Sequence, residues 1–295
     1  MSTLPDFVSE KWILLPDEHE VYIREWTPTT SPKAVVVFVH GFGEHCTRYD
    51  HVFTRFASES FRVVSYDQRG FGRTGQKSKK LGVTKGYATV LDDLTTIIKY
   101  AYTKEDEEAG RPLFLMGHSM GGAIVLNYAA MGELKEKIKA VIACSPLLVV
   151  PKETAPPRPV VALGSLLSKV IGSFQVPANV PSSGISRDEQ EVLKYDADPL
   201  VHNITSLRCA DDFMSEGKAL LTSRYKDIKV PIYVTHGTKD QLTSYEHTKQ
   251  FIDKFEGDKT FVTYDDFYHE LHNEPEPDRE RVIQGYIDFL KKQTQ

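Results

Sequence analysis

Residues 113–122 read LFLMGHSMGG, and this stretch decides the fold. Its first four residues are apolar and suit a buried strand, whereas residues 123–130 continue as a candidate helix. Between them, Gly117, Ser119 and Gly121 form a G-x-S-x-G turn, in which the chain reverses sharply and exposes the serine hydroxyl. Side chains two residues before and after the serine would collide in such a turn, so glycines are required there. The stretch therefore predicts a nucleophilic Ser119 on a strained strand-to-helix turn.

The alternation of strand and helix continues on both sides of this turn. Apolar, β-branched runs occur at residues 34–39, 62–66, 141–144, 232–235 and 261–264, and apolar residues have helical spacing at 91–101 and 282–290. This order predicts an α/β fold with a mostly parallel central sheet and helices on both faces.

The alternation stops between residues 147 and 229, where prolines punctuate the chain. Two helix candidates, around residues 163–174 and 189–193, occur there without a clear sheet strand. We therefore predict that residues 1–146 and 230–295 form the core and that residues 147–229 form a helical cap inserted over the strand ends.

A serine nucleophile needs a base and a third group that orients the base. In folds of this kind the acid follows the serine and the histidine comes last. Asp240 lies just past a strand end and is the candidate acid, whereas Asp265 and Asp266 lie too near the histidine to be the separate acid. His269 is the candidate base because it is the first histidine after the last strand. We expect His272 to lie in a surrounding shell or at the surface.

The reaction of a serine with an ester also needs donors for the oxyanion. One candidate is the backbone amide of Met120, at a helix start where free amides and the helix dipole favour negative charge. The loop at residues 40–45 reads HGFGEH, and its glycines let the backbone turn close to a substrate. Phe42 in this loop is the second candidate donor.

Composition and short motifs exclude several other classes of protein. The 295 residues contain 36 Lys and Arg against 41 Asp and Glu, a net charge of −5 without the basic clusters that nucleic-acid binding requires. The three cysteines form no CxxC pair, and the first residues lack a signal-peptide pattern, so we expect a cytoplasmic protein. Residues 70–75 read GFGRTG, but a polar stretch follows where a phosphate-binding helix should begin, and residues 269–272 lack the spacing of a zinc helix. We expect no nucleotide, metal or other cofactor.

Taken together, these motifs resemble those of the monoacylglycerol lipases, a family with the α/β-hydrolase fold. The resemblance is carried by HGFGEH at 40–45 with Arg48 and Tyr49, DQRGFG at 67–72, GHSMGG at 117–122, His236-Gly237 with Asp240, and His269 with Leu271. It spans nearly the whole chain, and the overall look of the motifs suggests fungal relatives. The resemblance implies a serine esterase that cleaves monoacylglycerols to glycerol and fatty acid through an acyl-enzyme, without a metal or an organic cofactor.

The resemblance further implies a set of residues that border the glycerol moiety. Tyr195 resembles a cap position of this kind, and Glu44, Arg48 and His272 sit where polar groups would border the moiety. Loop capping or an internal ion pair would explain Glu44 and Arg48 equally well.

Other functions stay open at this point. Lysophospholipases and short-chain carboxylesterases share the same triad, whereas a ligand-binding or interaction protein on this fold would not turn over. The apolar face of residues 163–174 suits an acyl tunnel, a shallow contact with lipid, or ordinary packing onto the core. We expect the cap to dock reversibly on membranes or lipid droplets.

Overall fold

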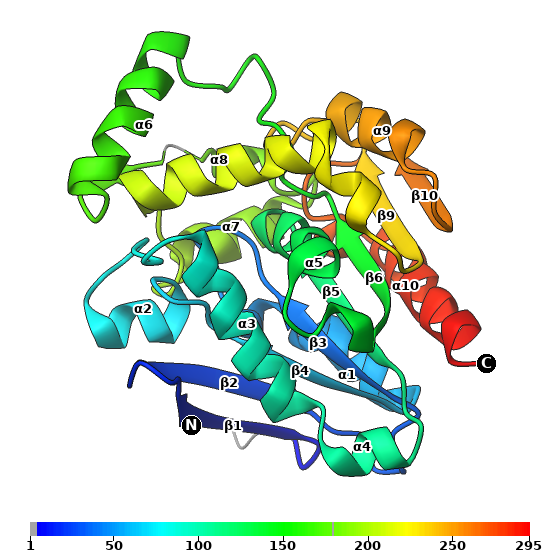
Figure 1. The fold of residues 1–295 in the computed structure, drawn as a ribbon. Coiled ribbons are helices and arrows are strands. Elements are labelled where there is room, and N and C mark those ends of the chain that lie inside the picture. Colours follow the sequence, from blue (N-terminus) through cyan, green and yellow to red (C-terminus); the bar gives the residue numbers. More distant parts are fainter. Residues whose placement is uncertain (1–4, 179) are drawn as a thin grey trace.

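An eight-stranded sheet lies at the centre of the computed structural model, which describes residues 5–178 and 180–295 (Figure 1). Its strand order is β1-β2-β4-β3-β5-β6-β9-β10. β2 pairs antiparallel with both β1 and β4, and all other neighbours are parallel. The strands are β1 (Val8–Leu14), β2 (Glu20–Trp26), β3 (Ala34–Val39), β4 (Phe61–Tyr66), β5 (Leu113–His118), β6 (Ile138–Cys144), β9 (Ile232–Gly237) and β10 (Lys259–Tyr264). The predicted mostly parallel sheet is confirmed.

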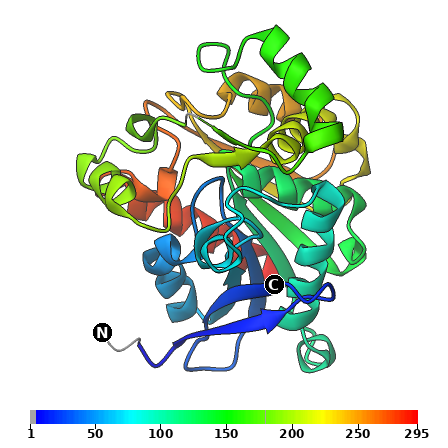
Figure 2. The same cartoon turned by 90° about the vertical axis from the view of Figure 1, so that its left-hand side faces the viewer.

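Helices cover both faces of the sheet (Figure 2). Because successive side chains of a strand point to opposite faces, β3 contributes Val35, Val37 and Val39 to one core and its remaining residues to the other. The first core also contains α3 (Tyr87–Ala101), α5 (Met120–Met131) and α9 (Tyr245–Lys254), and the second contains α1 (Asp50–Ser58) and α10 (Asp278–Thr294). Burial on both faces explains why the central strands are apolar throughout. The remaining core helices are α2 (Gly72–Ser78) and α4 (Lys104–Glu108).

The chain between β6 and β9 lies over the carboxyl ends of the parallel strands, as an inserted cap (Figure 1). It contains α6 (Arg158–Ile171), α7 (Glu189–Ala197) and α8 (Leu207–Thr222). It also contains the short strands β7 (Gln175–Pro177) and β8 (Ile204–Ser206), which pair with each other and not with the central sheet. Among the described residues, no helix is both long enough and apolar enough to cross a bilayer.

The GFGRTG sequence at residues 70–75 departs from expectation, because the helix α2 begins within it, at Gly72, and continues into the polar stretch that follows, to Ser78. The expectation that no helix follows the GFGRTG sequence was therefore wrong. The carboxylate of Asp67 occupies the start of this helix, accepting hydrogen bonds from the amides of Arg73 (2.7 Å) and Cys46 (2.9 Å). A Cβ on Gly72 would overlap the same carboxylate. An internal anion thus fills the position that a nucleotide phosphate would need.

Candidate active site

Ser119 sits on the turn between β5 and α5 in a strained conformation, with φ 55° and ψ −118°. A Cβ on Gly117 would overlap the backbone of Gly121, and a Cβ on Gly121 would overlap the carbonyl oxygen of Val39. The turn is held from the neighbouring strand, because the amide of Ser119 donates to the carbonyl of Cys144 at 2.9 Å. Packing of backbone against backbone therefore enforces both glycines and the strained serine.

Asp240 and His269 form a direct hydrogen bond, with 2.7 Å between Oδ2 and Nδ1. The other carboxylate oxygen of Asp240 accepts from the amides of Leu242 (2.8 Å) and Thr243 (2.9 Å). Burial alone would raise the pKa of Asp240, but the attraction of His269 and the hydrogen bonds from His236 and His269 outweigh it and hold the pKa well below 3.8. The acid is thus an anion fixed in orientation, and Nε2 of His269 is left for another partner.

The loop that carries His269 is anchored by both the core and the cap. The hydroxyl of Ser145 donates to the carbonyl of His269 at 2.9 Å. The amides of His269 and Glu270 donate to the carbonyls of Gly184 (3.3 Å) and Ile185 (2.6 Å) in the cap. The position of the candidate base therefore depends on the cap as well as on the sheet.

Ser119 and His269 line one cavity of about 670 Å³ between the core and the cap. Phe42 and Met120 also line it. Met120 is the first residue of α5, so its amide has no acceptor within the helix. Among the described residues, the backbone amide of Phe42 donates no hydrogen bond to a backbone carbonyl. The structure thus brings the candidate nucleophile, base and oxyanion donors to one cavity, with Asp240 behind His269.

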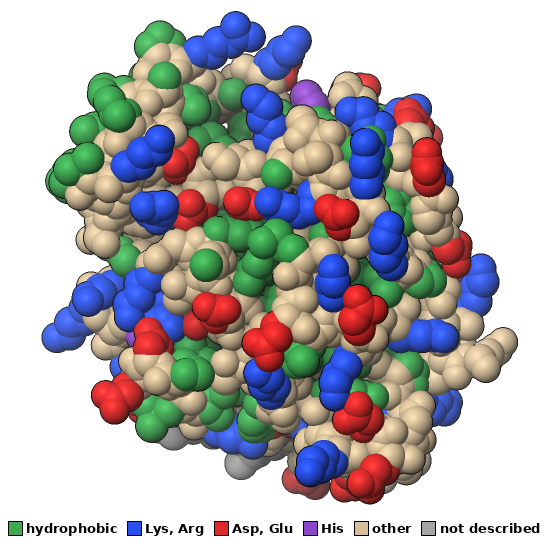
Figure 3. All heavy atoms as spheres, in the orientation of Figure 1, with side chains coloured by type: hydrophobic (Ala, Val, Ile, Leu, Met, Phe, Trp, Pro, Cys, Tyr) green, Lys and Arg blue, Asp and Glu red, His purple; other side chains and the backbone are tan. Residues whose placement is uncertain are grey.

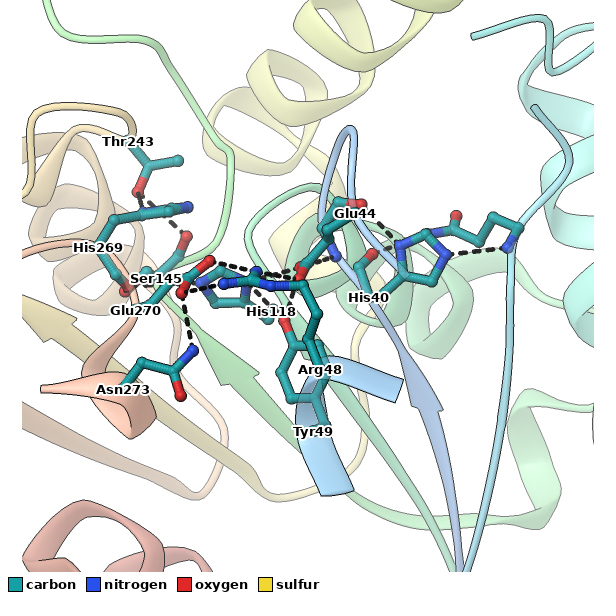
Figure 4. Close-up of polar contacts among 12 residues, drawn as sticks. His40, Glu44, Arg48, Tyr49, His118, Ser145, Thr243, His269, Glu270 and Asn273 are labelled. Carbon is teal, nitrogen blue, oxygen red and sulfur yellow. Dashed lines mark hydrogen bonds and ion pairs between the residues drawn. The ribbon is translucent and has the colours of Figure 1, made fainter. Parts of the chain in front are cut away.

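A buried ion cluster lies directly behind this site (Figure 4). Arg48 bridges two carboxylates, contacting Glu44 at 2.7 Å and Glu270 at 2.6 and 2.8 Å. Glu44 also accepts from the amide of Gly41 and the hydroxyl of Tyr49, each at 2.6 Å. The ion-pair interpretation of Glu44 and Arg48 therefore holds.

His118 is the remaining member of this cluster. Its Nδ1 lies 3.3 Å from the Glu44 carboxylate, and its ring centroid lies 4.6 Å from that of His269. Burial alone would lower the pKa of His118, but the hydrogen bond and the charge of Glu44 raise it above 6.5. The two carboxylates of the cluster thus face Arg48, and the raised pKa favours a positive charge on His118 beside Glu44.

Comparisons with known proteins place this geometry in a family. A family model described as serine aminopeptidase, S33, matches residues 30–276. A putative monoglyceride lipase of Schizosaccharomyces pombe is 36% identical over 91% of this chain and 69% of its own length. A monoacylglycerol lipase of Mycolicibacterium smegmatis is 31% identical over 85% of this chain and 86% of its own length. The chain belongs to the monoacylglycerol lipase family.

A solved structure agrees with this family membership. The crystal structure of a soluble variant of monoglyceride lipase from Saccharomyces cerevisiae, in complex with a substrate analog, has a TM-score of 0.90 and 25% identity. The match covers 100% of this chain and 97% of that one. The α/β-hydrolase fold and the resemblance to fungal relatives are both confirmed.

Within this member of the monoacylglycerol lipase family, the four residues expected around a glycerol moiety occupy different places. Glu44 and Tyr195 line the cavity. Arg48 lies behind Tyr195, with its guanidinium 4.7 Å from the ring centroid. His272 does not line the cavity: it is 2% exposed and packs against Tyr49 at 4.8 Å, and burial lowers its pKa well below 6.5. His272 therefore lies in the surrounding shell, one of the two places expected from its position in the loop, and not at the border that the resemblance implied, because the loop turns it inward behind the site.

Sequence reasoning missed residues that hold the site together. His118 and Glu270 each adjoin a candidate catalytic residue, and this adjacency was the available signal. Ser145 follows the end of β6 and Thr243 lies just before α9, and neither belongs to a distinguishing motif. Their contacts with His269 and Asp240 depend on the three-dimensional arrangement of the loops.

Proposed function

We propose that the protein hydrolyses monoacylglycerols to glycerol and a free fatty acid. The observation that carries this proposal is the chemical division of the cavity that Ser119 and His269 line. Toward the cap it is apolar, with Val160, Val161, Val176, Leu207, Phe213 and Met214 in its lining, whereas Glu44, Tyr195 and Glu270 contribute polar groups. Such a cavity fits an amphiphile with one acyl chain and a small polyol group.

In the proposed mechanism, Nε2 of His269 takes the proton of Ser119 as the serine oxygen attacks the ester carbonyl. The amides of Phe42 and Met120 stabilise the oxyanion, and Asp240 keeps His269 in the required tautomer. His269 then passes its proton to the glycerol oxygen as the ester C–O bond breaks. Water, deprotonated by the same histidine, attacks the acyl-enzyme, and His269 returns the proton to the Ser119 oxygen as the bond to the acyl group breaks and the fatty acid leaves.

Glu44 and Tyr195 are the proposed contacts of the glycerol moiety. Glu44 lines the cavity, and its carboxylate is held in place by Gly41, Arg48 and Tyr49. Arg48 acts from behind Tyr195 rather than by direct contact. This arrangement offers a fixed acceptor to glycerol hydroxyls.

A substrate panel tests the proposed function. The panel contains 1- and 2-monoacylglycerols of several chain lengths, di- and triacylglycerols, lysophospholipids, p-nitrophenyl butyrate and an aminoacyl p-nitroanilide. We expect the highest kcat/KM on a monoacylglycerol, and Ser119→Ala reduces that turnover by about 10⁴- to 10⁶-fold. A preference for lysophospholipid, a short-chain ester or the anilide would replace the proposal, and near-normal hydrolysis by Ser119→Ala would end it.

We also propose that the protein is cytoplasmic and docks on membranes or lipid droplets through α6. Its three cysteines are free and buried, which suits a reducing compartment. Hydrophobic side chains gather over α6 in Figure 3, and Val170, Leu166 and Phe174 are 80%, 63% and 60% exposed. Such an exposed apolar patch supports a lipid contact rather than packing onto the core.

Liposome flotation tests the docking. Substitution of Leu166 and Val170 by serine is expected to reduce the fraction that floats and the activity on dispersed substrate. The matched control is Leu14→Ser, because Leu14 is 66% exposed but lies on β1, at the opposite end of the molecule from α6 (Figure 1). Equal flotation of the double variant, the control and the wild type would refute the docking.

A further inference from the structure

The cap residue His202 contacts the loop that carries Phe42. Its backbone amide donates to the carbonyl of Gly43 at 2.9 Å. Gly43 has φ +75°, and a Cβ there would lie 2.5 Å from the carbonyl oxygen of His202. Only glycine permits this backbone conformation and this close approach. The residue after Phe42 is therefore joined directly to the cap.

The side chain of His202 is also fixed, in a single tautomer. The amide of Ile204 lies 3.2 Å from Nδ1 and can only donate, so Nδ1 is an acceptor. The carbonyl of Gly70 lies 3.0 Å from Nε2 and can only accept, so Nε2 carries the proton. Burial lowers the pKa of His202, in agreement with a neutral ring.

The His202 ring is linked to Phe42 through one intervening aromatic side chain. It stacks on Phe71 with 5.5 Å between centroids and 3° between planes. Phe71 is fully buried and meets the edge of the Phe42 ring at 5.4 Å and 74°. The side chain of Phe42 and the next residue, Gly43, thus both rest on contacts that end at His202.

We propose that His202 is a positioning residue for the oxyanion hole, through which the cap holds the Phe42 amide where the oxyanion forms. This inference rests on the proposed function, because that function makes the Phe42 amide a donor. Loss of the ring removes the stack on Phe71 and the bond to Gly70 while leaving the backbone bond to Gly43 in place. The Phe42 amide is then no longer fixed in position, and this lowers the stabilisation of the transition state more than it lowers the affinity for substrate.

Kinetics on matched oxo- and thionoesters test this inference. Sulfur accepts hydrogen bonds weakly, so an intact oxyanion hole favours the oxoester. A displaced donor lowers the ratio of kcat on the oxoester to kcat on the thionoester, which we call the oxo-to-thiono ratio. We expect His202→Ala to lower kcat on a 1-monoacylglycerol about ten- to hundredfold, to change KM much less, and to reduce the oxo-to-thiono ratio. His202→Phe retains a ring that stacks on Phe71 and is expected to recover part of the ratio. Asn203→Ala is the matched control, since the Asn203 amide bonds within the cap to Val180.

The outcomes separate this inference from the proposed function. A wild-type enzyme that does not hydrolyse the monoacylglycerol refutes the proposed function. A wild-type enzyme with normal turnover, together with His202→Ala of unchanged melting temperature and unchanged oxo-to-thiono ratio, overturns the positioning role alone. Should His202→Ala fail to fold, the same ratio measured on His202→Leu decides, since leucine fills the space without a stacking ring, and a wild-type ratio there overturns the inference.

Discussion

Glu270→Gln tests whether the buried ion cluster holds the loop that carries His269 in place. Glu270 is 2% exposed and accepts hydrogen bonds from Arg48 at 2.6 and 2.8 Å and from Asn273 at 2.8 Å. Glutamine keeps the volume but removes the charge, so the guanidinium of Arg48 is left with one carboxylate partner, Glu44, in place of two. Removal of one partner of a buried ion pair costs about 3–5 kcal/mol. At roughly 2–4 °C per kcal/mol, the melting temperature should fall by roughly 6–20 °C.

The same change should slow catalysis, because His269 is the neighbouring residue. We expect kcat at pH 7.5 to fall about ten- to hundredfold, which is the scale of a small displacement of a catalytic group. The matched control is Glu280→Gln, since Glu280 pairs with Arg55 at the surface, where both side chains are over a third exposed. An exposed pair contributes at most about 1 kcal/mol. A melting temperature of Glu270→Gln equal to that of the wild type at pH 7.5 would refute the reasoning.

The pH dependence of this difference follows from the sign of the pKa shift. Burial alone would raise the pKa of Glu270, but the charge and hydrogen bonds of Arg48 outweigh it and hold the pKa below 4.5. A carboxyl with a lowered folded-state pKa stabilises fully above its unfolded value and loses this contribution as the pH falls through its folded value. Thermal melts from pH 3.5 to 8 should therefore show the full difference between wild type and Glu270→Gln above about pH 4.5 and a smaller one below it.

Three further substitutions test separate parts of the structure. Gly121→Ala places a Cβ in the carbonyl of Val39 and should yield unfolded or inactive protein, whereas Gly164→Ala, with open space around its Cβ, should keep its melting temperature; a folded, active Gly121→Ala would contradict the account of the turn. Asp240→Asn should lower kcat about 10⁴-fold by releasing the His269 tautomer, and a loss below about tenfold would argue against that role. Burial raises the pKa of Asp212 to about 6, and its Oδ2 has no partner among the described residues. Because the folded pKa exceeds 3.8, stability falls as the pH rises from 3.8 through 6, so Asp212→Asn should raise the melting temperature at pH 8 and have little effect at pH 3.5, and a decrease at pH 8 would contradict this.

The central strands and the turn at Ser119 were predictable because each carries its own local signal. The apolar run of β3 has the same bounds in the structure as in the prediction, since a strand buried on both faces has no polar residue within it. The turn was predictable because backbone overlap leaves no alternative to glycine at Gly117 and Gly121. The positions of Asp240 and His269 followed from the order of strands in the chain.

Other elements were missed because long-range contacts decide them. β2 contains the charged residues Arg24 and Glu25, which are each 5% exposed and become buried only through ion pairs with distant partners. His272 turns inward because Tyr49 and His118 enclose it. The helix α8 did carry a local signal, namely the capping residue Ser206 followed by apolar positions at helical spacing, and a closer inspection of periodicity would have found it.

We expect the cap of this protein to contribute to catalysis as well as to cover the cavity. The carbonyls of Gly184 and Ile185 in the cap accept hydrogen bonds from the loop that carries His269, and His202 in the cap contacts the loop that carries Phe42. A simple lid would restrict access, so loosening it should leave unchanged or increase the hydrolysis of a small soluble ester such as p-nitrophenyl acetate. If the cap positions both loops, loosening it should instead slow the hydrolysis of p-nitrophenyl acetate. This ester has no long acyl chain to bind, but its hydrolysis still needs the base and the oxyanion hole. We therefore expect His202→Ala to lose turnover on p-nitrophenyl acetate about as much as on a long-chain monoacylglycerol, and an increase on the acetate would show that the cap acts as a lid only.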